Sequence, residues 1–261
     1  MNALAALLPD VSRGALRVWQ RNRDSFRGYY LAALVGNLGE HLIYLLGMGL
    51  GVGAYVRLGG DIPYLEFIAP GLVVSSSMWS SSLECTYGSF TRMTQQKTYD
   101  GVLATPCSVA DIVTGDILWG STRAVLSAFT MMVVMAAFGL VRSPLAPLVF
   151  PVVFLQGFLF ASIGMIVTAL SPSYFFFNYH YTILITPMFF LSGIFFPISD
   201  FGPAVQWAAW SLPLTHAVDA ARALTLGEGL RAVPPAVLWM ALASALLYPF
   251  AVHMIRRRLI K

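Results

Sequence analysis

The chain has 261 residues, of which 57% are apolar and only 11% are charged. An average soluble domain carries about 25% charged residues, and it has no use for the apolar blocks of about twenty residues found here. This composition excludes an ordinary soluble enzyme and predicts an all-α polytopic membrane protein. The formal net charge is +4, but most basic residues are arginines beside apolar blocks, so we interpret them as topology signals and expect no nucleic-acid partner.

Residues 1–28 are predicted to form an amphipathic helix in the membrane interface. On a helical wheel the apolar side chains fall within one arc, whereas Arg13, Arg17, Arg21, Arg23 and Arg27 fall on the rest. Such a helix rests its apolar face on lipid and turns its guanidinium groups toward anionic headgroups. A solvated basic arm is the alternative. The spread of arginines differs from a cleavable signal peptide, so we expect this segment to be retained.

Six apolar segments have about the length needed to cross a bilayer core. They are residues 31–56, 65–87, 117–140, 145–170, 179–196 and 237–255. The second contains several serines, whose hydroxyls can bond back to carbonyls of their own helix. Of the 16 Lys and Arg residues, only four fall on the side opposite the N-terminal arginines: Arg57, Arg142, Arg222 and Arg231. This bias predicts that both chain ends face the cytoplasm.

The polar stretch 88–116 is expected to be a structured cytoplasmic element. Thr105 and Pro106 break it, and Ser108 with Asp111 then has the pattern of a capped helix restart. Two helices around a proline break form a compact surface that suits docking of a soluble partner, although a plain surface hairpin is the alternative. The charges expected to couple this element to a partner belong to Arg92, Lys97 and Asp100.

The stretch 197–235, after the fifth predicted span, is too apolar for a free loop. Its prolines and tryptophans predict short helices that dip into the outer leaflet without crossing it and shape the external mouth of a pathway. An interfacial lid with belt tryptophans and no transport role is an equal alternative. The candidate residues are Pro197, Trp207, Trp210, His216, Asp219 and Arg222.

The candidate pathway residues within or at the end of predicted spans are Glu40, His41 and Glu84. An intramembrane carboxylate is costly, so it usually faces the protein interior or a cavity. Contact with a substrate head group and a proton relay are two functional interpretations, and a satisfied hydrogen bond between helices is the third. The serines at 75–82 would add polar groups to such a pathway, and the aromatic cluster 174–181 would add apolar walls.

The chain carries no sequence motif for catalysis, a metal or a cofactor. A Walker A motif needs glycines and a lysine at fixed spacing, but the only lysines are Lys97 and Lys261. The four histidines form no HExxH pair, no GxSxG elbow is present, and the two cysteines suggest free thiols. We therefore expect a non-enzymatic membrane subunit that obtains ATP and Mg²⁺ chemistry only through a partner.

Four blocks of sequence carry a family resemblance: GNLGEHLIYLLGMGLGVG, FIAPGLVVSSSMWSSSLECTYGSFTRM, ALSPSYFFFNYHYTILITPMFFLSGIFFPIS and LPLTHAVDAAR. In this order and spacing the chain resembles the nodulation protein J branch of the ABC-2 (type-2 ABC) exporter permeases over nearly its whole length. The resemblance implies six transmembrane helices in a bacterial inner membrane, a homodimer, and two copies of a separate cytoplasmic ATPase. It also implies a coupling helix within 92–106, external re-entrant helices within 197–222, and an N-terminal interface helix beside the ATPase.

The resemblance further implies ATP-driven export of an amphiphilic substrate, because that branch exports a lipo-chitooligosaccharide. Drug-like and polysaccharide exporters share the same permease plan, so these substrates are the alternatives within the class. A proton-coupled secondary transporter would predict two related halves, and the sequence shows no convincing internal repeat. A membrane anchor without transport activity would not need the structured stretch after the second span.

Overall fold

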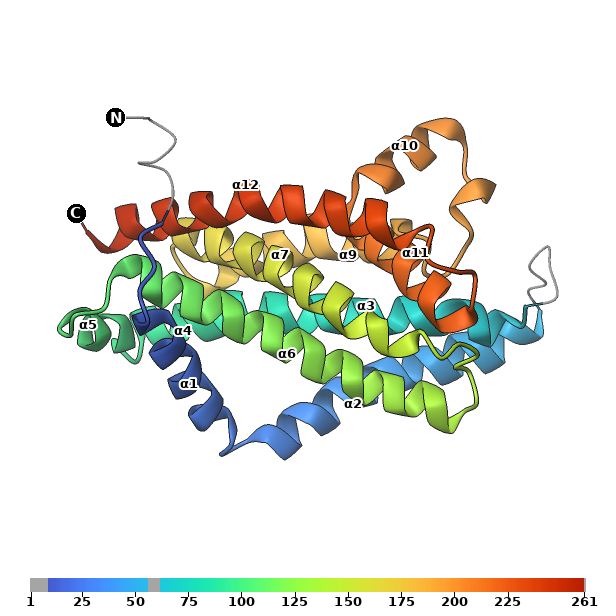
Figure 1. The fold of residues 1–261 in the computed structure, drawn as a ribbon, viewed down its shortest axis with the longest axis horizontal. Helices are drawn as coiled ribbons and strands as arrows, with labels where there is room; N and C mark the ends of the chain where they lie inside the picture. The colour runs from blue at the N-terminus through green and yellow to red at the C-terminus, as the bar shows by residue number, and fades with distance from the viewer. Residues whose placement is uncertain (1–8, 56–61, 261) are drawn as a thin grey trace.

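The computed structural model describes residues 9–55 and 62–260, and within those ranges every regular element is helical. The long helices, roughly aligned in Figure 1, are α2 (Tyr30–Leu46), α3 (Tyr64–Leu83), α6 (Val109–Ala137), α7 (Val149–Leu170) and α12 (Val233–Leu259). The shorter ones are α1 (Gly14–Phe26), α4 (Ser89–Thr94), α5 (Thr98–Leu103), α8 (Phe177–Tyr179), α9 (Thr186–Leu191), α10 (Pro203–Ser211) and α11 (Pro213–Leu226). The predicted all-α class is confirmed.

Three helical segments are long and apolar enough to cross a membrane: Val109–Ala137, Ala146–Leu170 and Val233–Leu259. They contain or nearly coincide with the third, fourth and sixth predicted spans. The other predicted spans fall largely on α2, α3 and α9, and each includes residues of a π-helical turn, at Gly47–Gly51, Glu84–Gly88 and His180–Ile185 respectively. The apolar helices indicate an integral membrane protein, whereas the number of six spans stays a prediction.

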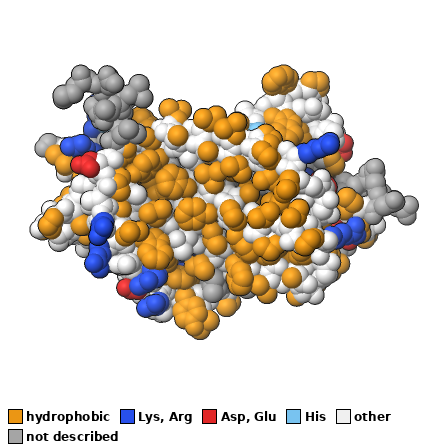
Figure 2. All heavy atoms as spheres, in the orientation of Figure 1, with side chains coloured by type: hydrophobic (Ala, Val, Ile, Leu, Met, Phe, Trp, Pro, Cys, Tyr) orange, Lys and Arg blue, Asp and Glu red, His pale blue; other side chains and the backbone are white. Residues whose placement is uncertain are grey.

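Apolar side chains remain exposed along the middle of the bundle. In Figure 2 they cover the central part of the visible face, and most Lys and Arg side chains lie toward its two ends. On α12, Leu238, Leu242 and Leu246 are 61%, 64% and 74% exposed. Because these residues recur every four positions, they form one stripe along the helix. A stripe of this kind fits contact with lipid or another membrane subunit.

Most serines of α3 are satisfied inside the bundle, and Ser82 is the exception among them. Ser75, Ser76 and Ser77 donate to the carbonyls three residues earlier, at 3.1, 2.8 and 2.6 Å, which confirms the predicted back-bonding. Ser77 also donates to Gln156 Oε1 of α7 at 3.0 Å, and Gln156 Nε2 donates to the Val74 carbonyl at 2.9 Å. These bonds join α3 to α7 without leaving the buried amide unpaired.

The two ends of the bundle differ. Helices α1, α4 and α5 lie at one end together with the C-terminal end of α12, whereas α10 and α11 lie at the other (Figure 1). The first end contains the segments predicted to be cytoplasmic and the second contains the segment predicted to be external. Two short helices do follow Pro197, and Leu212 separates them.

Helices α6 and α7 approach closely at Gly157. A Cβ added there would lie 2.5 Å from the Cβ of Ala124 and 3.1 Å from the Cα of Ser121, both on α6. Contacts this short leave no room for a side chain, because the second partner is backbone. Gly157 therefore sets the distance between these two helices.

Replacing Gly157 with alanine is expected to lower the free energy of unfolding by about 1–3 kcal/mol, because overpacking pushes the helices apart. The measurement is the thermal unfolding midpoint of detergent-purified protein. Gly36→Ala on α2 is the matched control, since a Cβ there meets nothing within 4 Å. Equal midpoints for the two variants would show that α6 and α7 do not pack this closely.

Candidate functional site

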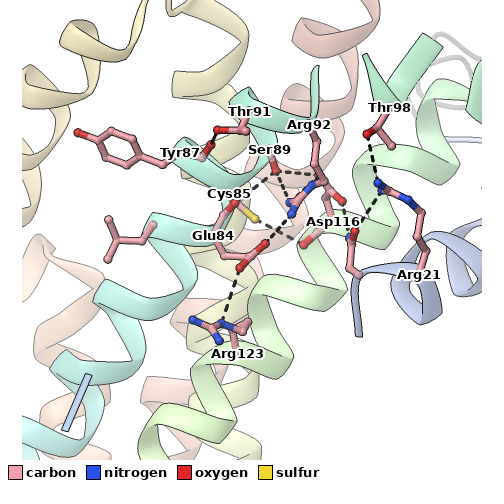
Figure 3. A network of polar contacts seen from close by, with 12 residues as sticks. Arg21, Glu84, Cys85, Tyr87, Ser89, Thr91, Arg92, Thr98, Asp116 and Arg123 are labelled. Carbon is pink, nitrogen blue, oxygen red and sulfur yellow. Dashed lines mark hydrogen bonds and ion pairs between the residues drawn. The ribbon is translucent and has the colours of Figure 1, made fainter. Parts of the chain in front are cut away.

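A buried polar network joins α1, α4, α5 and α6 at the end of the bundle that contains the predicted coupling element (Figure 3). Its centre is Asp116 on α6, whose side chain is 0% exposed. The carboxylate accepts hydrogen bonds from Asn22 Nδ2 at 2.6 Å, Ser89 Oγ at 2.8 Å and Tyr99 OH at 2.5 Å. It also accepts from Arg92 Nε and Nη2, at 3.3 and 3.1 Å.

Arg92 connects this carboxylate to a second one. Its Nη1 donates to Glu84 Oε1 at 2.7 Å, and the other oxygen of Glu84 lies 3.7 Å from Arg123 Nε. The Arg123 guanidinium also lies 4.3 Å from the centre of the Phe26 ring on α1. Removing charges from water costs several kcal/mol per ion, so such a cluster is stable only when its members are paired and hydrogen-bonded.

Tyr99 contributes to the network as a neutral donor. Burial raises the pKa of the Tyr99 phenol well above its usual value, and the negative charge of Asp116 raises it further. The hydroxyl therefore keeps its proton at neutral pH and holds α5 against α6. A fully buried phenol at the start of a short helix gives that helix a fixed place in the fold.

Helix α1 is docked on α6 by polar contacts along its length. Ser12 donates from its backbone N–H and its hydroxyl to the two carboxylate oxygens of Asp111, at 2.7 and 2.9 Å. Trp19 Nε1 donates to Thr122 Oγ1 at 2.9 Å. A Cβ added at Gly115 would lie 2.5 Å from the Cβ of Val18, so the two helices are in close contact. Ser108 and Asp111 form the capping box that the sequence predicted.

The residues predicted to contact a partner fall into two groups. Lys97, Asp100, Thr105 and Pro106 are exposed on the hairpin of α4 and α5. Arg92 is only 12% exposed at its side chain and points into the network. Its expected role as a direct contact is therefore revised: Arg92 positions the hairpin, because its guanidinium is already paired inside the molecule.

The three candidate pathway residues have different surroundings. Glu84 is paired with two arginines, and His41 on α2 is 3% exposed. The side chain of Glu40 lies outside the described part of the structure. Beside Glu84, three aromatic rings stack between α3 and the segment before α9: the ring of Trp79 lies 5.2 Å from that of Tyr181, which lies 6.0 Å from that of Tyr87.

At the opposite end of the bundle, Arg222 on α11 holds several elements together. It donates to the carbonyls of Gly193 at 2.8 Å and Phe67 at 3.3 Å, and its guanidinium lies 3.9 Å from the centre of the Phe67 ring. Asp219 and Pro197 line a small cavity beside it. These contacts bring α11, α3 and the segment after α9 together.

The remaining candidate residues of this end lie nearer the surface. His216 Nε2 is 2.9 Å from the Trp210 carbonyl, and its ring stacks on Trp239 at 4.8 Å. Trp207 is 79% exposed. The position of Trp207 fits a belt tryptophan, whereas His216 is engaged within the fold.

The comparisons with known proteins identify the class. The profile of the ABC-2 type transporter family matches residues 16–226. The chain belongs to the ABC-2 type transporter family. It is 39% identical to nodulation protein J of Rhizobium leguminosarum bv. trifolii over 256 residues, which cover 97% of both chains. It is 39% identical to that of Rhizobium meliloti over 225 residues, or 86% of both, and 33% identical to that of Bradyrhizobium diazoefficiens over 257 residues, or 98% of both.

Membership of the ABC-2 family confirms the resemblance found in the sequence and makes the chain a membrane component of an ABC transporter. The family implies an ABC ATPase as partner. Sequence reasoning predicted a structured stretch at 88–116 but missed Asn22, Tyr99 and Asp116, the residues that hold it against α1 and α6. One feature of the sequence could have pointed to this network. Asp116 is a carboxylate that directly precedes the predicted span 117–140, where a charge is costly unless it is paired.

Replacing Asp116 with asparagine is expected to destabilise the protein by about 3 kcal/mol, because Arg92 loses one of its two buried carboxylate partners and keeps only Glu84. Thermal unfolding of the purified chain measures the effect. The control is Asp24→Asn, which removes a carboxylate that is 54% exposed and pairs with Arg23. That change should cost about 0.5 kcal/mol or less. If Asp116→Asn is as stable as the control, the network does not hold these helices.

Proposed function

We propose that this chain is the permease subunit of an ATP-driven exporter that moves an amphiphilic, glycolipid-like substrate out across a bacterial cytoplasmic membrane. It works as a homodimer with two copies of a separate ATPase, and both chain ends lie in the cytoplasm. The observation that carries the proposal is the exposed hairpin of α4 and α5, fixed to the bundle by buried charges in a chain of the ABC-2 family.

The hairpin offers a surface on which a soluble partner can dock. Lys97 lies at its tip with a left-handed backbone, at φ +52°, and so turns the chain sharply from α4 into α5. Lys97 and Asp100 present opposite charges to solvent, while Tyr99 between them is buried. Alternation of this kind lets a partner push on the outer face while the inner face stays fixed to α6.

In this proposal, the network transmits movement of the hairpin to the helices of the bundle. An ATPase dimer shifts a conformational equilibrium only by the difference in its affinity for the two states. Force on the hairpin reaches α6 through Asp116 and reaches α1 through Asn22, so the three elements move as one body. The permease then exposes its pathway to one side or the other as the ATPase pair closes and opens.

Charge reversal at Lys97 is expected to weaken ATPase binding at least about tenfold, because like charges then face each other across the docking surface. The tagged chain is co-expressed with the ATPase encoded beside it, and the co-purified, vanadate-sensitive ATP hydrolysis is measured. Arg231→Glu, an equal change on an exposed residue at the far end of the bundle, is the control. Equal recovery of ATPase activity with both variants would contradict docking at the hairpin.

Similarity and the surroundings of α3 support the proposed substrate class. The curated relatives are named nodulation protein J. Buried hydroxyls line α3 beside the partly exposed ring of Trp79, which places polar and aromatic surfaces along one helix. An amphiphile needs both, since its head and its tail require different surroundings.

A lipooligosaccharide is expected to stimulate ATP hydrolysis by the reconstituted complex, whereas the same oligosaccharide without its acyl chain is not. The acyl chain contributes most of the apolar area that the pathway can bury. The assay compares hydrolysis rates at equal concentrations of the two compounds and a drug-like cation. Stimulation by the cation or by the bare oligosaccharide alone would identify one of the other exporter types and exclude the amphiphile.

A further inference from the structure

A cavity of about 370 Å³ lies between α1 and α4, directly beside the buried network. Arg21 and Ser25 line it from α1, Tyr29 lines it from the turn before α2, and Arg92 and Gln96 line it from the opposite wall. Glu84 also reaches the cavity, but its two oxygens already face Arg92 and Arg123. The wall of the cavity therefore contains two guanidinium groups and one carboxylate, and that carboxylate is already paired with Arg92 and Arg123.

The charges around this cavity do not balance. The network has the guanidinium groups of Arg21, Arg92 and Arg123 against the carboxylates of Glu84 and Asp116. Among the described residues, Arg21 finds only neutral partners, donating to Thr98 Oγ1 at 3.1 Å and Asn22 Oδ1 at 3.5 Å. One positive charge is left over in a partly buried site, where an unpaired charge is costly.

The protonation of Arg21 agrees with this imbalance. Burial lowers the pKa of Arg21 and the positive charge of Arg92 lowers it further, while the carboxylate of Asp116 offsets part of this shift without contacting Arg21 directly. An anion between the two guanidinium groups would reverse the second effect. The remaining wall groups suit the same ligand, because Ser25, Tyr29 and Gln96 each carry a side-chain donor that has no acceptor in the described part of the chain.

We propose that the cavity between α1 and α4 binds a phosphate-bearing anion through the guanidinium fork of Arg21, assisted by the second N–H of Arg92 Nη1, whose first N–H is bonded to Glu84. Arginine forks match phosphate oxygens in geometry and charge, and one negative charge balances the cluster. The volume accommodates a phosphate group with its immediate substituent and leaves acyl chains outside. Two sources carry this group at the end of a membrane helix bundle: the headgroup of an anionic phospholipid and free phosphate.

Occupancy of this site bridges α1 and α4, which the network otherwise joins through Asp116. A ligand that binds only the docked arrangement stabilises it by mass action. The anion thereby favours the state in which the interface helix, the hairpin and α6 move together. This regulation is independent of the substrate proposed above, since it requires only the residues of the cavity wall.

The test measures the thermal unfolding midpoint of the delipidated full chain in maltoside detergent. Phosphatidylglycerol, diacylglycerol of the same chains, or millimolar inorganic phosphate at constant ionic strength is added. We expect phosphatidylglycerol, phosphate or both to raise the midpoint by about 5 °C or more, and diacylglycerol to have no effect. A rise with phosphatidylglycerol alone assigns the site to a lipid headgroup, and a rise with inorganic phosphate alone assigns it to a free anion.

Two pairs of variants tie the shift to the cavity. Arg21→Gln is expected to abolish it, whereas Arg17→Gln, one turn earlier on an exposed face of α1, is expected to retain it. Ser25→Glu places a carboxylate at the rim and is expected to abolish the shift, while Ser25→Gln retains it. Ser25 is exposed, so this second pair stays informative even if Arg21→Gln does not fold.

The proposal is overturned if neither phosphate source raises the midpoint of the wild-type chain. It is also overturned if Arg17→Gln loses the shift to the same extent as Arg21→Gln, or if Ser25→Glu retains it. Loss of ATPase binding in the Lys97→Glu experiment would leave these results unchanged, because Lys97 does not line the cavity.

Discussion

The arrangement at the hairpin end depends on one carboxylate. Asp116 is fully buried on α6, and its oxygens accept hydrogen bonds from α1, from α4 and from α5. A buried carboxylate is stable only if such partners surround it, so the cost of burying it selects a single arrangement of the four helices. Any displacement of one element leaves a charge or a donor unpaired, so the cluster opposes small movements of the helices that it joins.

The bundle behind this cluster is built for rigidity. Gly157 on α7 lets that helix contact the backbone of α6, and Gly115 on α6 leaves room for Val18 of α1. Ser75 and Ser76 of α3 donate to carbonyls of their own helix. At the same end, Arg258 of α12 donates to the carbonyl of Ala169, in the last turn of α7, and to that of Ser171, just after it. These contacts satisfy polar groups inside an apolar bundle and give the long helices little freedom to slide separately.

The sequence predicted the parts of this protein that depend on local patterns. Apolar length marked α6, α7 and α12, the spacing of Ser108 and Asp111 marked the start of α6, and the run of serines marked the back-bonded face of α3. The network was not predictable in the same way, because Asn22, Ser89, Tyr99 and Asp116 meet only through tertiary packing. Arg92 shows the limit most clearly: its charge suggested a surface contact, and only the fold reveals that two carboxylates face it.

In the proposed mechanism, the charged cluster connects the soluble ATPase partner to the apolar bundle. In the middle of the bundle, Gln156 and Ser77 form a neutral pair, and such a pair transmits little directional force. At the hairpin end, the charges of Glu84, Arg92 and Asp116 link four elements through several strong bonds at once. Because charge-assisted bonds resist separation more than neutral ones, a push on the hairpin moves α1 and α6 before it breaks the cluster. The chain thus concentrates its charged contacts at the end where we propose that the ATPase docks and leaves its exposed apolar stripes free of directional contacts, a division that suits rigid-body movement of the helices.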